Sequence, residues 1–140
     1  MGNPTKNKKF SFSKSIDQVS IILLIPQVQD DGTVEKVEVE HCFKINSLFE
    51  AMEAFRSALY VVDKKGQVRV DQGAAGFALW WKTIKEVKNY DPEEMGENWK
   101  QFFKTNSTAH EHATQAGGLL ADQLGMIQGK LTVPFGKSGS

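Results

Sequence analysis

The hydrophobic pattern of this chain changes its period near Ile45–Ser47, and this change limits the possible folds more than any other feature. Residues 34–43 alternate between apolar and charged or polar side chains, the period expected of a strand with one wet face. After Ser47 the apolar residues recur at helical spacing. A single helical bundle would not show this change. The sequence therefore predicts an α+β fold in which an N-terminal antiparallel β-hairpin packs on a small bundle of three to four helices.

The first strand of the hairpin is predicted in the mainly apolar residues 19–26. Asp31-Gly32 separates it from residues 34–43 and supplies the positive φ angles of a two-residue turn. Such a turn pairs Leu24 with Val39. The expected core side of the ribbon then consists of Ile22, Leu24, Val37 and Val39. The other side, expected to be only half covered, sets Ile21, Leu23 and Ile25 against Glu38 and Glu40.

The first helix is predicted over about residues 47–60. Ser47 to Glu50 has the capping-box pattern, in which both side chains bind free backbone N–H groups at a helix start. The apolar residues that follow form one stripe: Leu48, Met52, Phe55 and Leu59. We expect this stripe to lie in the core.

Three more helices are predicted downstream. Residues 74–88 give the most apolar of them, Asp91-Pro92 is typical of the start of a short one, and the last runs from about Thr108 to Leu124. Gly117-Gly118 is expected to bend or fray the last helix, since each glycine costs roughly 0.5–1 kcal/mol relative to alanine. Between the first two helices, residues 61–62 and 68–70 favour a second hairpin, with a loop and an extended return as the alternative.

The length of 140 residues fits one domain. Residues 1–15 carry four lysines and no acid and predict a flexible basic arm, residues 16–127 a single α+β domain, and residues 128–140 a flexible tail. Seventeen basic residues balance seventeen acidic ones, which disfavours nucleic-acid binding. The apolar runs are far shorter than a membrane span, no signal peptide is visible, and one cysteine excludes an internal disulfide. We expect a soluble cytoplasmic protein.

The residues that could be catalytic or bind a metal do not have the spacing that such sites require. His110 and His112 diverge by about 200° on a helix, so we expect no metal site and solvated or capping histidines. His41 and Cys42 are neighbours in a strand and point to opposite faces, so they cannot form a nucleophile and its base. Residues 73–76 lack the Lys-Ser/Thr of a phosphate-binding loop and favour close packing at a helix start. We predict no enzymatic activity, no cofactor and no metal.

The aromatic residues are the most unusual feature. Trp80 and Trp81 are consecutive and point about 100° apart on a helix, so one of them can reach the surface, although a broad core could hold both. Exposed tryptophans often anchor protein interfaces. The predicted partner-binding residues are Phe77, Trp80, Trp81, Trp99 and Phe103, with Trp99 and Phe103 as rim or buried backing.

The segment from Phe77 to Asp91, with the acidic segment Pro92–Trp99 after it, resembles the tail assembly chaperones of long-tailed bacteriophages and prophages. The resemblance covers residues 46–124 and implies binding to the tape-measure protein, without chemistry or a cofactor. Two alternatives stay open from the sequence: a structural virion subunit of the tail, neck or baseplate, and a bacterial protein-interaction module. In each of them the partner is another protein, and an oligomer is possible.

Overall fold

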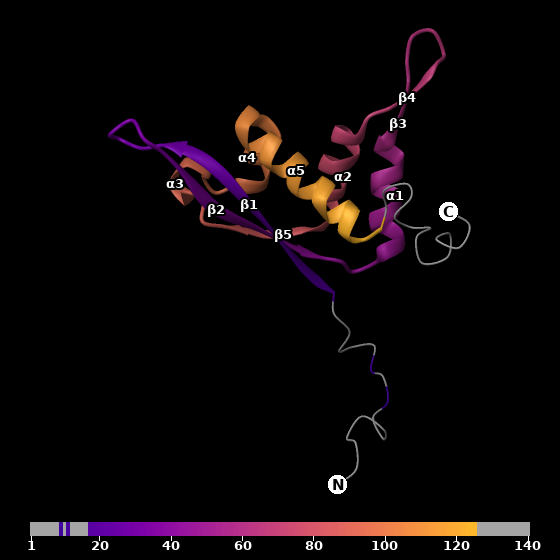
Figure 1. Ribbon diagram of the computed structural model, residues 1–140. Helices are drawn as coiled ribbons and strands as arrows, with labels where there is room; N and C mark the ends of the chain where they lie inside the picture. Colours follow the sequence, from indigo (N-terminus) through magenta and orange to yellow (C-terminus); the bar gives the residue numbers. More distant parts are fainter. Residues whose placement is uncertain (1–8, 10, 12–16, 126–140) are drawn as a thin grey trace, which may run out of the picture.

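The computed structural model describes Lys9, Ser11 and residues 17–125 (Figure 1). The predicted arm at residues 1–15, apart from Lys9 and Ser11, and the predicted tail at residues 128–140 lie outside these residues. The α+β prediction, with an N-terminal antiparallel hairpin against helices, is confirmed. The elements are β1 (Gln18–Val28), β2 (Val34–Lys44), α1 (Leu48–Leu59), β3 (Tyr60–Val62), β4 (Val68–Val70), α2 (Gln72–Thr83), β5 (Ile84–Lys88), α3 (Pro92–Met95), α4 (Trp99–Thr105) and α5 (Ser107–Gln123).

The turn between β1 and β2 has three loop residues, not the predicted two. The Gln29 N–H donates to the Thr33 carbonyl at 2.7 Å, which makes these two residues the closing pair. Gly32 is the third loop residue and has a φ of +86°. A positive φ is common at the third position of such loops. The Asp31 carboxylate holds the loop by accepting from the Thr33 N–H at 2.9 Å and from its hydroxyl at 2.6 Å.

This extra loop residue moves the register by one position and reverses the two faces of β1 relative to β2. Leu24 lies opposite Glu38, and Leu23 takes the predicted place opposite Val39. The predicted core side is therefore wrong for β1: Ile22 and Leu24 are 52% and 59% exposed. The buried face of the hairpin carries Ile21, Leu23, Val39, His41 and Phe43.

The predicted helix over residues 74–88 ends at Thr83, and its last five residues form the strand β5. β5 pairs antiparallel with β2, giving the strand order β1-β2-β5. The apolar pair Ile84 and Val87 fits a helix face as well as a short irregular strand, and the pairing with β2 decides between them. β3 and β4 form the second hairpin that the sequence favoured.

The first helix begins as predicted, with the Ser47 hydroxyl accepting from the Glu50 N–H at 3.2 Å. Phe55 is buried, as expected from the apolar stripe. The stripe is rotated relative to the prediction, because Ala51 is also buried whereas Leu48 is 48% exposed. α1 packs on α2 and fixes the outer side of the helical layer.

α5 is the centre of the packing, since it contacts β1, α2 and α4 (Figure 1). It runs through Gly117-Gly118 without interruption, so the expected fraying at these glycines is wrong. A Cβ atom on Gly117 would overlap the Gly76 carbonyl, and a Cβ atom on Gly76 would lie 2.9 Å from the Thr114 carbonyl. The glycines are therefore the point where α2 and α5 touch backbone to backbone, which agrees with the close packing expected of residues 73–76.

Candidate functional site

The structure brings the five predicted partner-binding residues into one aromatic cluster. The ring centroids of Phe77 and Trp80 lie 5.8 Å apart, and those of Trp80 and Phe103 lie 5.2 Å apart. Trp81 and Trp99 complete the cluster at 6.5 Å and 6.3 Å from Trp80. We call these five residues, Phe77, Trp80, Trp81, Trp99 and Phe103, the aromatic cluster.

Two members of the cluster are core residues. Trp80 and Phe103 are 0% exposed, so neither can contact a partner directly, and the prediction of Trp80 as a contact residue is wrong. Phe77, Trp81 and Trp99 are only partly buried and pack against the core. The surface part of the cluster is therefore Phe77, Trp81 and Trp99, with Trp80 and Phe103 as a rigid backing.

Two lysines of α4 lie over the Trp81 ring. The Lys100 Nζ is 4.4 Å from the ring centroid and the Lys104 Nζ is 5.3 Å away, both within the range of cation–π attraction. Partial burial lowers the pKa of Lys100. Neither lysine was among the predicted binding residues, although their spacing of four places them on one face of a helix. We call Trp81, Lys100 and Lys104 the Trp81 platform.

Behind the platform runs a chain of polar side chains in which Trp80 and His41 are buried and Tyr90 and His112 are partly buried. The Trp80 indole N–H donates to His41 Nδ1 at 2.9 Å, His41 Nε2 lies 2.7 Å from the Tyr90 hydroxyl, and this hydroxyl lies 3.1 Å from His112 Nδ1. An indole nitrogen can only donate, so His41 Nδ1 carries no proton and Nε2 carries it. His41 then donates to Tyr90, and Tyr90 donates to His112. We call Trp80, His41, Tyr90 and His112 the relay; its three hydrogen bonds all run in one direction, from Trp80 outward.

The relay corrects the expectation of solvated or capping histidines. His41 is 0% exposed, and burial, aided by the charge on His112, lowers its pKa to about 4. Burial also lowers the pKa of His112 and raises the pKa of Tyr90. The strand pattern held a signal for His41, because it follows Val37 and Val39 on the alternating face that turns inward.

The relay ends at a surface cavity. A cavity of about 540 Å³ lies between the hairpin and the segment from β5 to α5. Its lining includes His112, Tyr90, Ile25 and Pro26, with Asp91 and Glu94 as its acidic groups. His112 is the outermost group of the relay, and its one hydrogen bond among the described residues is at Nδ1. Its Nε2 proton is therefore left for solvent or for an occupant of this cavity.

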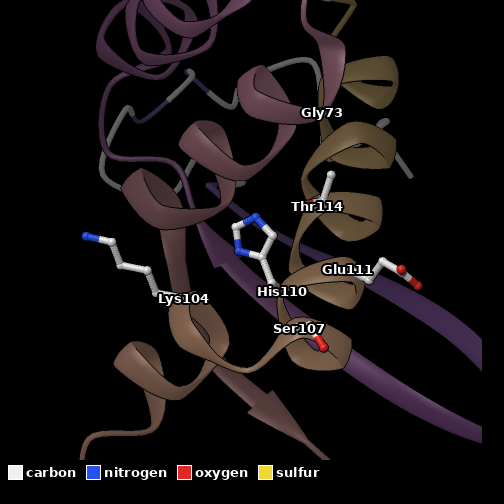
Figure 2. A pocket seen from close by; sticks show the side chains of 6 residues that line it. All are labelled: Gly73, Lys104, Ser107, His110, Glu111 and Thr114. Carbon is white, nitrogen blue, oxygen red and sulfur yellow. The ribbon is translucent and has the colours of Figure 1, made fainter.

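His110 lies on the other side of α5 and stacks on Phe77, with ring centroids 4.2 Å apart. Its Nδ1 atom is buried and makes no hydrogen bond within the described part of the chain. Figure 2 shows the ring at the wall of a shallow cavity of about 550 Å³, from which the Lys104 side chain extends away. The imidazole therefore acts mainly as a flat packing surface for the aromatic cluster.

The other candidates for chemistry lie apart from one another. Within residues 17–125, together with Lys9 and Ser11, no three His, Cys, Asp or Glu side chains are placed to hold a metal ion. His41 and Cys42 point to opposite faces: the Cys42 thiol contacts the Ser20 hydroxyl at 3.7 Å and the Glu40 carboxylate at 3.4 Å. Burial raises the pKa of this thiol, which disfavours the reactive thiolate.

None of the helices in the described residues is both long and apolar enough to cross a bilayer. Comparisons of the chain with models of protein families, with curated proteins and with solved structures found no match.

Proposed function

We propose that the chain is a non-enzymatic protein-binding module whose contact surface is the Trp81 platform with Phe77 and Trp99 beside it. The observation that carries this proposal is the position of the Trp81 ring, partly exposed on α2 and overlaid by two lysine ammonium groups. Buried Trp80 and Phe103 support it from below. A rigid aromatic side chain on a packed base is typical of the residues that dominate binding energy in protein interfaces.

The chemistry of the platform points to a partner segment that is both apolar and acidic. An apolar side chain of the partner can cover the indole face, while a carboxylate pairs with Lys100 or Lys104. Such a pair draws the lysine away from the ring and gains a charge-assisted hydrogen bond in its place. Lys82 next to Trp81 and Lys85 in β5 add positive charge to the same part of the chain, although Lys82 is engaged by Glu50 at 3.3 Å.

The resemblance of residues 46–124 to tail assembly chaperones makes the tape-measure protein the first partner to test. In this role the chain would cover apolar segments of the tape-measure protein until they are built into the tail. The chaperone would then be absent from finished particles, whereas a structural tail, neck or baseplate subunit would be present in them. Immunodetection of the chain in purified particles distinguishes these two roles.

The binding test uses the purified chain with a tape-measure protein of a long-tailed bacteriophage. Trp81→Ala should weaken binding by about tenfold or more, because an interface anchor contributes roughly 2 kcal/mol. Tyr60→Ala is the matched control, since Tyr60 is a 59% exposed aromatic on β3, which lies beside the start of α2, whereas Trp81 is near its end. Titration calorimetry measures both affinities.

Because Trp81 also packs on the core, a charge-reversed variant with Lys100→Glu and Lys104→Glu gives an independent measurement. It leaves the aromatic residues in place. It should weaken the binding of an acidic partner segment more strongly at low salt than at high salt. Unchanged affinity in both the Trp81→Ala and the charge-reversed protein, with thermal unfolding showing both folded, would refute the platform as the contact surface.

A further inference from the structure

The outer edge of β1 differs from the other strand edge of the sheet. Among the described residues no strand pairs with this side of β1. The strand is eleven residues long and has no charged residue between Gln18 and Val28. The opposite edge, β5, has five residues and carries Lys85, Glu86 and Lys88. Edge strands of natural proteins are usually short, charged or covered, so the long neutral edge of β1 is open to further pairing.

The hairpin hydrogen bonds show which backbone groups of β1 face this edge. The Gln29 N–H bonds to Thr33 and the Ile45 N–H bonds to the Asp17 carbonyl, both at 2.7 Å, so the odd-numbered positions of β1 bond to β2. In an antiparallel ladder the bonded positions alternate, and the even-numbered positions therefore point away from β2. Free N–H and C=O groups are presented by Gln18, Ser20, Ile22 and Leu24.

Pro26 marks the end of this open segment. It occupies an even-numbered position, so the N–H that proline lacks would have faced the open edge and costs no hydrogen bond to β2. An added strand can pair fully from Gln18 to Leu24 and loses a donor at Pro26. The open segment is thus seven residues long and has Ile21 at its middle.

We propose that the occupant of this edge is a second copy of the chain, paired antiparallel through β1 about a two-fold axis at Ile21. This register pairs Ser20 with the partner's Ile22 and Gln18 with the partner's Leu24, and each such pair exchanges both backbone hydrogen bonds. It uses every free group of the open segment and leaves Pro26 outside. The sheet then continues from one copy into the other.

Two features favour a second copy over another extended peptide or an open filament. A neutral strand can lie against itself without placing like charges opposite each other, which would be unfavourable. Pairing of β1 with the β5 edge of another copy would instead set apolar residues against Lys85, Glu86 and Lys88. The symmetric pairing closes at a dimer. It also brings Ile22, 52% exposed in one chain, near its own copy across the axis.

The first test is the molar mass in solution, measured by light scattering over a concentration series. The chain mass is 15.6 kDa, and the dimer should appear at twice this mass as the concentration rises. Ile22→Pro removes one edge-facing N–H in the manner of Pro26 and should remain a monomer at the concentrations where the parent is a dimer. Ile22→Val keeps both the donor and an apolar side chain and should remain a dimer.

Ile22→Lys is the second variant, for the case that the proline substitution prevents folding. Ile22 lies opposite Glu40, so a lysine at this position has an opposite charge within its own chain but meets its own copy across the two-fold axis. It should therefore be a folded monomer. A parent protein that stays monomeric throughout the series, or a folded Ile22→Lys protein that dimerises as the parent does, would overturn the proposal.

Amide hydrogen exchange locates the contact. In the dimer the amides of Ser20, Ile22 and Leu24 should be protected, and their protection should grow with protein concentration. The amide of Val28, beyond Pro26 on the same edge, should stay unprotected. If dimerisation protects other amides and leaves those of Ser20, Ile22 and Leu24 unchanged, the two copies meet elsewhere. This proposal does not depend on the Trp81 platform.

Discussion

Acid should destabilise this protein through His41, the second member of the buried relay. Its Nδ1 atom accepts from Trp80 and its Nε2 atom faces Tyr90, so protonation at Nδ1 breaks the bond to the indole. The pKa of His41 falls from 6.5 to about 4 on folding, because burial disfavours the charged form. The unfolded chain therefore binds the proton first as the pH falls. The stability contributed by neutral His41 is present above pH 6.5 and is lost between this value and about pH 4.

The size of the effect follows from this difference. The pKa falls from 6.5 to about 4, and at about 1.4 kcal/mol for each unit this corresponds to roughly 3 kcal/mol over the full range. About 2 kcal/mol of this should be lost between pH 7 and pH 5. No reduction for solvent screening applies, because the side chain is 0% exposed. For a domain of this size such a loss is a large part of the total stability.

Urea unfolding at pH 7, 6 and 5, followed by tryptophan fluorescence, measures the effect. The reference is His41→Gln, whose amide can accept from Trp80 and donate to Tyr90 but does not titrate in this range. Carboxylates and His112 titrate in both proteins, so the difference between the two pH dependences isolates His41. The parent should lose about 2 kcal/mol more than His41→Gln between pH 7 and pH 5. Parallel losses in the two proteins would refute the assignment of a buried neutral imidazole.

Two further predictions concern the packing of the helices. Phe55→Ala should lower the free energy of unfolding by roughly 3–5 kcal/mol, as measured by urea denaturation, because Phe55 is only 4% exposed; unchanged stability would show that α1 does not close the core. Gly117→Ala should destabilise by about 1–3 kcal/mol because the methyl group overlaps the Gly76 carbonyl. Gly118→Ala, where the new Cβ would meet no atom within 4 Å, should stabilise by roughly 0.5–1 kcal/mol through helix propensity, and equal effects at the two glycines would contradict the backbone contact between α2 and α5.

Local sequence signals predicted the elements of the fold well. The alternation of residues 34–43, the cap at Ser47 and the proline start after Asp91 each depend on neighbours in the chain, and the structure confirms each of them. The register of the first hairpin was predicted wrongly, because Asp31-Gly32 fits a two-residue turn and also the end of a three-residue loop. The sequence of the turn does not distinguish these, and one residue of difference reverses the faces of β1.

Features that depend on contacts distant in sequence were predicted less well. Ile84–Lys88 has apolar spacing compatible with a helix, and only the free edge of β2 makes it a strand. The members of the aromatic cluster were predicted correctly. The burial of each member was not, since the burial of Trp80 depends on contacts with α4 and β2. The relay was missed because Trp80, His41, Tyr90 and His112 come from four separate segments: α2, β2, the loop after β5, and α5. Its one sequence signal was a histidine on the inward face of β2.

The backbone contact between Gly76 and Gly117 has a consequence for binding at the opposite side of α2. α2 carries Trp81, and α4, which packs on α5, carries Lys100 and Lys104. At the Gly76–Gly117 contact no side chain lies between α2 and α5, so backbone atoms set the separation of the two helices there. The backbone positions that carry the indole and the two ammonium groups are therefore fixed before a partner arrives. On binding at this surface, the conformational entropy that is lost would be mainly that of the partner.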